Sequence, residues 1–224
     1  MPVILEKTII VGPPNSGKST YIRGLNSNIL FWKDYRMNAL KDTNKRIEEE
    51  IEKRLFRHNP FYADEPFFLI PPLLCPNLFG QFKNHSFFVS THRISYFSLI
   101  CPSKIILADN FSYTSITPER LVGLVEKPSE DVYYRDCRHF VDFLNTFSDV
   151  DISPETFEEI VKNPLLNAIR TTPFVRDAII MGVYGVSIKE YLKRIIEYFN
   201  KNSKDIPITH RTIINKQLSP LEII

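Results

Sequence analysis

The sequence has few cysteines, no long apolar run and little net charge, and each shortage excludes a class of protein. Its 224 residues include only Cys75, Cys101 and Cys137, an odd number at wide spacing, so we expect reduced, buried thiols and no disulfide framework or zinc site. No apolar run approaches the roughly 20 residues that span a bilayer, and the N-terminus lacks a secretory-signal pattern. These features predict a cytoplasmic protein with no membrane partner.

The balance of charge is also uninformative about a polyanionic partner. The 28 lysines and arginines against 26 acidic residues give a net charge of +2. Nucleic-acid-binding domains usually carry a clear excess of positive charge. The composition therefore gives no general indication of nucleic-acid binding.

Glycine is scarce, which makes its positions informative. The chain has 7 glycines against 16 prolines, and Gly12, Gly17 and Gly24 all lie near the N-terminus. A β-branched apolar run at 8–11 precedes Gly12 and predicts a buried strand that ends in a turn. A helix is predicted to begin near Lys18 and to end near residue 25.

Two glycines five residues apart, followed by lysine and serine between a strand and a helix, are the pattern of a phosphate-binding loop. Gly17 lets the backbone curl so that N–H groups point at an anion at the N-terminus of the helix. Lys18 is predicted to neutralise the β and γ phosphates, Ser19 to offer its hydroxyl to Mg²⁺, and Thr20 to bind the α-phosphate. The predicted binding residues are Gly12, Pro13, Pro14, Asn15, Ser16, Gly17, Lys18, Ser19 and Thr20.

The predicted ligand is a nucleoside triphosphate with magnesium. A guanine-specific site would be indicated by an Asn-Lys-x-Asp signature, which the sequence lacks. ATP with Mg²⁺ is therefore the expected ligand. The loop alone does not say what is done with the nucleotide, because kinases, motor ATPases and GTPases share it.

The remaining pattern predicts an α/β fold, that of a three-layer P-loop NTPase with a mainly parallel sheet of about five strands. Prolines and aromatic residues at 61–82 indicate a loop-rich segment that is not a regular helix. A core at 1–145, with an insertion-like part at 38–82, is expected to precede a helical C-terminal extension at 146–224. Strands are expected at 8–11, 29–32, 86–89, 104–108 and 121–125, and helices at 18–25, 38–57, 129–145, 154–161, 172–181 and 187–200.

Three further segments resemble the layout of thymidylate kinases and related nucleoside and nucleotide kinases. They are Val89-Ser90-Thr91-His92-Arg93, Leu107-Ala108-Asp109-Asn110, and Val125-Glu126-Lys127-Pro128 leading to Arg135 and Arg138. The resemblance implies that Arg93 holds an acceptor phosphate and that Asp109 lies near the acceptor or near the metal, which it would then share with Ser19. It implies that Arg135 and Arg138 clamp the phosphoryl group as it moves from ATP to a nucleoside, a nucleotide or another small acceptor.

A second resemblance points to a different class. In FtsK- and HerA-type motor ATPases, including viral packaging ATPases, a Walker B Asp-Glu pair is followed by a strand that ends in a Ser-Thr-Gln-Arg-like sensor. Asp64-Glu65 and Ser90-Thr91-His92-Arg93 are similar to these parts. This resemblance implies a ring-forming homo-oligomer that acts on nucleic acid or a protein partner. The residues at 59–62, however, include Pro60 and predict a poor buried strand before Asp64.

The two resemblances leave the function open between a phosphotransferase, which the strand-end motifs favour, and an oligomeric ATPase. A third interpretation is a nucleotide-binding regulator with negligible turnover. All three interpretations include the phosphate-binding loop. They differ in which residues face the terminal phosphate of the nucleotide.

Overall fold

The chain forms a six-stranded, mainly parallel sheet with helices on both faces and a helical C-terminal part. This confirms the predicted α/β fold class. The computed structural model describes residues 5–12, 15–31, 40–66, 76–82, 84–91, 101–120, 130–147, 150–168, 174–202, 204, 208, 211 and 212.

The sheet has the strand order β2-β3-β4-β1-β5-β6. All neighbouring strands are parallel except β5 and β6, which form an antiparallel hairpin at one edge. The central strand β1 therefore has β4 on one side and β5 on the other. The strands are β1 (Lys7–Val11), β2 (Leu30–Phe31), β3 (Phe61–Asp64), β4 (Phe87–Thr91), β5 (Lys104–Asp109) and β6 (Ser112–Ile116).

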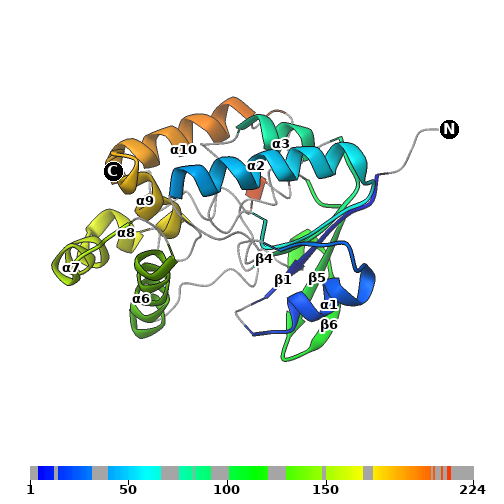
Figure 1. Cartoon of the computed structure of the whole chain (residues 1–224), viewed down its shortest axis with the longest axis horizontal. Helices are drawn as coiled ribbons and strands as arrows, with labels where there is room; N and C mark the ends of the chain where they lie inside the picture. The colour runs from blue at the N-terminus through cyan, green and yellow to red at the C-terminus, as the bar shows by residue number, and fades with distance from the viewer. Residues whose placement is uncertain are drawn as a thin grey trace.

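Each face of the sheet is covered by helices, which explains why β1 reads as a continuous apolar run. Ile10 points to the face covered by α1 (Lys18–Leu25), where it packs with Ile22 and Ile106. Ile9 and Val11 point to the opposite face and join the larger core formed with the other helices. Figure 1 shows α1 and α2 (Leu40–Arg57) on opposite sides of the sheet.

The larger core continues into the C-terminal helices. They are α6 (Glu130–Phe147), α7 (Pro154–Lys162), α8 (Pro164–Ala168), α9 (Phe174–Val183) and α10 (Ile188–Asn202). At the start of α7, where the sequence predicts a helix from residue 154, Ser153 accepts a hydrogen bond from the Thr156 amide and Pro154 lies in the first helical turn. In Figure 1, β1 runs from the N-terminal side of the molecule toward the side where α6 and α9 lie.

The prediction for residues 61–82 is wrong in two places. Residues 61–64 form β3, and residues 76–82 form the helix α3 (Pro76–Phe82). Pro60 lies just before β3, so its missing N–H is not required by the sheet. Phe61 and Phe82 are buried and pack edge to face, with their ring centroids 5.7 Å apart. Aromatic packing thus offsets the poor local strand signal.

Other differences concern elements with weak local patterns. The exposed edge strand β6 and the short helix α8 were not predicted. The predicted strand at 121–125 lies outside the described residues. Cys75 also lies outside them, while Cys101 is half-buried rather than buried. Cys137 is buried as predicted, and this burial raises the pKa of its thiol to about 11.

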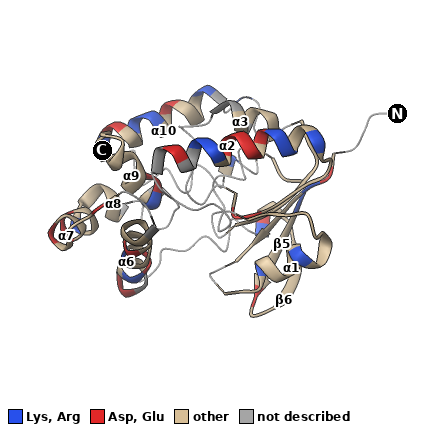
Figure 2. Cartoon of the chain, in the orientation of Figure 1, with Lys and Arg blue, Asp and Glu red and all other residues tan. Residues whose placement is uncertain are grey.

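The described helices include no candidate membrane span, and two of them carry charges of both signs. Among the described residues, none of the helices combines the length and apolarity that crossing a bilayer requires. Basic and acidic side chains are interspersed along α2 and α10 (Figure 2). These two helices therefore present mixed charge to solvent.

Candidate functional site

The predicted phosphate-binding loop follows β1 directly and leaves no room for a side chain at Gly12. The Gly12 amide donates a hydrogen bond to the carbonyl oxygen of Thr91 at the end of β4, at 3.2 Å. A Cβ atom built on Gly12 would collide with the carbonyl oxygen of Ala108 and would lie 2.5 Å from Ser16 Oγ. The first glycine of the motif is thus required by close approach of the backbone.

The end of the loop leaves the start of α1 without a side-chain cap and leaves one buried hydroxyl without a partner among the described residues. Gly17 is the N-cap of α1 with φ 94°, no side chain caps the helix, and its first turn has no acidic residue. The buried Ser16 Oγ has no hydrogen-bond partner within the part of the chain that is described. An uncapped helix N-terminus beside a buried, unsatisfied hydroxyl fits an anion such as a phosphate.

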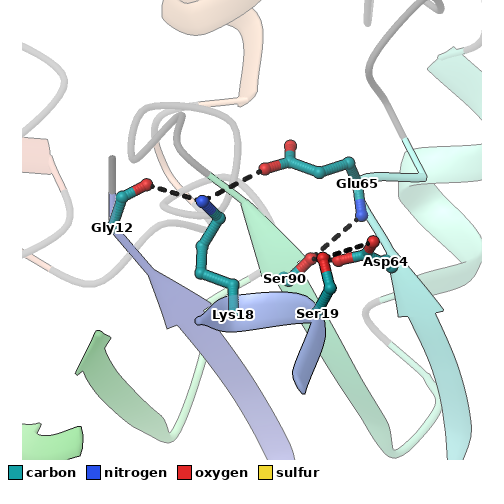
Figure 3. A network of polar contacts seen from close by, with 6 residues as sticks. All are labelled: Gly12, Lys18, Ser19, Asp64, Glu65 and Ser90. Carbon is teal, nitrogen blue, oxygen red and sulfur yellow. Dashed lines mark hydrogen bonds and ion pairs between the residues drawn. The ribbon is translucent and has the colours of Figure 1, made fainter. Parts of the chain in front are cut away.

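Lys18 lies in the loop as a buried cation. Only 7% of its side chain is exposed, and its Nζ donates to the Gly12 carbonyl oxygen at 2.9 Å and lies 3.8 Å from Glu65 Oε1 (Figure 3). Burial lowers the pKa of Lys18, and the positive charge of Arg176 lowers it further, while Glu65 and Asp64 act in the opposite direction. Lys18 thus holds a poorly solvated charge that an anion would stabilise.

Asp64 connects the loop to β3 and β4. Its Oδ2 accepts a hydrogen bond from Ser19 Oγ at 2.8 Å, and its Oδ1 accepts one from Ser90 Oγ (Figure 3). The register of the sheet places Asp64 opposite Ser90, and both residues are buried. A carboxylate is therefore fixed beside the serine that the motif assigns to magnesium, across one intervening strand.

Glu65 follows with a backbone conformation that bulky residues rarely adopt. Its φ is 49°, and its amide donates to Ser90 at both the carbonyl oxygen, at 3.2 Å, and Oγ, at 3.1 Å. A non-glycine residue in the left-handed region costs about 1–3 kcal/mol and is often found at functional sites. Here the conformation turns the carboxylate of Glu65 toward Lys18 (Figure 3).

Three other predicted site residues, Asp109, Arg135 and Arg138, contribute no hydrogen bond or ion pair to this network within the described part of the chain. Asp109 is exposed where β5 meets the hairpin turn, on the side of β1 opposite Asp64. Arg135 is exposed on α6, and Arg138 pairs with Asp142 at 3.1 Å and lies over a phenylalanine ring of α7. The roles assigned to these three residues stay predictions. Pro13, Pro14, His92 and Arg93 lie outside the described residues, while Asn15 and Thr20 are exposed.

The oxygen donors at the site fit magnesium. Among the described residues, there is no cluster of three or more His, Cys, Asp or Glu side chains that would form an all-protein metal cage. Magnesium is instead usually bound by one or two protein oxygens together with phosphate oxygens and water. Ser19 and Asp64, already joined by a hydrogen bond, are the residues that would hold it.

Four residues of the site, Asp64, Glu65, Ser90 and Arg176, were not among the predicted site residues. Asp64, Glu65 and Ser90 were noted only as parts of family-like segments, although the Asp-Glu pair was the signal that pointed to them. Arg176 of α9 had no signal in the sequence. Its charge acts on Lys18 although the two residues are far apart in the chain, and its guanidinium also lies 5.3 Å from the centroid of the Phe140 ring.

Comparison with known proteins adds no assignment, because neither a protein-family model nor a curated protein matches this chain. The fold that the structure defines is an α/β domain with a mostly parallel six-stranded sheet.

Proposed function

We propose that this chain is a magnesium-dependent ATPase that hydrolyses the terminal phosphate bond of ATP at the network of Lys18, Ser19, Asp64 and Glu65. The observation that carries the proposal is the hydrogen bond from Ser19 to the buried Asp64, with Glu65 next in the chain and 3.8 Å from Lys18. This places an acidic pair and a cation around the start of α1.

Each residue then has a defined role. The start of α1 and Lys18 bind the phosphates, and Ser19 with Asp64 would hold magnesium. When bound, the metal neutralises charge on the phosphate oxygens. Glu65 accepts a proton from the attacking water while the oxygen of that water forms a bond to the γ-phosphorus. The bond between that phosphorus and the β–γ bridging oxygen breaks, and ADP leaves with the released electron pair.

The strand order supports this class over phosphoryl transfer to a small acceptor. Ser90 lies on β4, the strand between β1 and β3, and contacts both the Asp64 carboxylate and the Glu65 amide. The resemblance to motor ATPases implies that the Asp-Glu pair and the strand that follows it act together. The contacts of Ser90 agree with that arrangement. The kinase interpretation instead depends on Asp109 and on arginines that contribute no hydrogen bond or ion pair to this network or lie outside the described residues. It remains the alternative outcome of the experiment.

The experiment follows the fate of γ-labelled ATP in the presence of magnesium and a panel of nucleosides and nucleotides. We expect label in free phosphate at a rate that the acceptors do not change, and no labelled acceptor. Lys18→Ala should abolish nucleotide binding and turnover, whereas the control Lys45→Ala, at an exposed residue of α2, should affect neither. Label on an acceptor would establish a kinase, and binding without turnover would establish a regulator.

A ring-forming ATPase also makes a prediction about assembly. Light scattering in the presence of ATP and magnesium should show a homo-oligomer, and DNA or RNA should raise phosphate release. A monomer whose turnover is indifferent to nucleic acid would contradict the motor class while leaving ATP hydrolysis itself intact.

A further inference from the structure

The hairpin formed by β5 and β6 has an unusual turn. Asp109 pairs with Ser112, and the two residues between them, Asn110 and Phe111, have φ values of 43° and 62°. Two-residue turns of this kind strongly favour glycine at the second position, because a side chain there is strained. The chain instead holds a phenylalanine, and 60% of it is exposed. An exposed aromatic residue in a strained conformation suggests a role other than folding.

This turn is attached to the predicted phosphate-binding loop. The Phe111 amide donates to the Ser16 carbonyl oxygen at 3.0 Å, and Tyr113 Oη donates to the Gly17 carbonyl oxygen at 2.9 Å. A Cβ built on Gly17 would lie 2.8 Å from Phe111 Cδ1 and 2.7 Å from Tyr113 Oη. Both side chains therefore touch the loop where it enters α1.

A second aromatic ring supports the hairpin from α1. Tyr21 lies one turn into the helix, and its ring centroid is 4.7 Å from that of Tyr113, with the planes inclined by 55°. Tyr21 is also packed against the smaller core beneath α1. The three aromatic residues thus form a connected group at the loop, of which Phe111 is the most exposed.

The sheet order places this aromatic group on the side of the loop opposite the acidic pair. Asp64 and Glu65 lie beyond β4, while Phe111 and Tyr113 belong to the hairpin on the other side of β1. In the proposed function the terminal phosphate lies beside Glu65. The nucleoside is the far end of the same molecule, so it extends from the loop away from Glu65.

We infer that Phe111, supported by Tyr113 and Tyr21, is the platform on which the base of the bound nucleotide stacks. The inference rests on the nucleotide binding of the proposed function. The part of the ligand placed there is the nucleobase, an aromatic ring system that stacks on an exposed aromatic side chain. Stacking tolerates any base, so Phe111 contributes affinity without selecting adenine over guanine.

Calorimetry with three ligands tests this platform. ATP, ADP and inorganic tripolyphosphate, each with magnesium, are titrated into wild type, Phe111→Ala and Phe111→Trp. Loss of a base–aromatic stack weakens binding by about 5- to 150-fold. We expect Phe111→Ala to lose affinity for ATP and ADP to this extent and to keep that for tripolyphosphate within about twofold, because only the base contact is removed. Phe111→Trp should restore nucleotide affinity.

Two further variants control for folding and for general surface effects. Phe111→Gly should fold at least as well as wild type, because glycine accepts the positive φ, and it should show the same selective loss. Phe56→Ala removes a ring that is 75% exposed on α2, and it should leave the affinity for all three ligands unchanged.

Three results would overturn the platform: ATP binding by Phe111→Ala within twofold of wild type, equal losses for ATP and tripolyphosphate, or wild-type affinity for tripolyphosphate equal to that for ATP. Each leaves the dependence of phosphate binding on Lys18 intact. Failure of wild type to bind any of the three ligands would instead overturn the proposed function together with the platform.

Discussion

A single methyl group at Gly12 should destabilise the protein, whereas the same methyl group at Gly24 should stabilise it. A Cβ at Gly12 would collide with the Ala108 carbonyl oxygen of β5 and lie 2.5 Å from Ser16 Oγ. The first neighbour is backbone in the centre of the sheet and cannot move without displacing β5. At Gly24, an exposed position in α1, a Cβ would meet no atom within 4 Å.

The expected magnitudes differ in sign. Overpacking of this kind costs about 1–3 kcal/mol, and in a chain of this length each kcal/mol changes the melting temperature by about 2–4 °C. Gly12→Ala should therefore melt about 2–12 °C below wild type. Replacing a helical glycine with alanine stabilises by about 0.5–1 kcal/mol, so Gly24→Ala should melt about 1–4 °C above wild type.

Thermal unfolding without nucleotide, followed by circular dichroism, measures both variants against wild type. The absence of ligand matters because a lost phosphate contact would then make no contribution. A Gly12→Ala variant that melts at or above wild type would refute the close approach of the loop to β5. Gly24→Ala controls for any general effect of adding a methyl group.

Two further predictions concern buried polar groups. Ser90→Ala removes one of the two hydroxyl donors to buried Asp64 and should lower the free energy of unfolding by about 1–3 kcal/mol in urea titrations, while an unchanged unfolding midpoint would contradict the network. Burial raises the pKa of the Cys137 thiol to about 11, so at about pH 8 only about one thiol in a thousand is ionised. Iodoacetamide should label Cys137 far more slowly in the folded protein than in urea. The labelling rate of the folded protein should rise with pH up to about 11. Equal labelling rates in the folded and unfolded states would contradict the burial of this thiol.

The sequence was sufficient for the part of the site that is local in the chain. The strand before Gly12, the turn at Gly17 and the helix that begins at Lys18 follow from a β-branched run, two glycines and a helical pattern within about 20 residues. The C-terminal helices other than α8 were also predictable: α7 and α10, for example, are strongly amphipathic, and α7 begins with a serine cap.

The acidic half of the site was harder to predict because it depends on long-range pairing. Asp64 reaches Ser19 only because β4 lies between β1 and β3 and brings Ser90 opposite Asp64. No local pattern encodes that register, and β3 itself is a four-residue strand preceded by Pro60. From the sequence alone, Asp109 at the end of a strand is as good a candidate for the metal site as Asp64. Only the strand order distinguishes the two.

The hairpin at Phe111 was missed for a related reason. Its turn lacks the glycine that normally identifies a two-residue hairpin, and β6 is mostly exposed and polar. The hydrogen bonds from Phe111 and Tyr113 to the loop show why the turn forms nonetheless. Tertiary contacts there override an unfavourable local preference.

The central claim is that the acidic pair of β3, and not the aspartate at the end of β5, serves the phosphate loop. The most direct test compares steady-state phosphate release and ATP affinity for Glu65→Gln and Asp109→Asn. We predict that Glu65→Gln lowers phosphate release by about 10²- to 10⁴-fold, as expected for loss of a general base, and retains ATP binding. Asp109→Asn should remain within about twofold of wild type, because its side chain is exposed beyond β1. Full activity in Glu65→Gln together with loss of activity in Asp109→Asn would contradict the account.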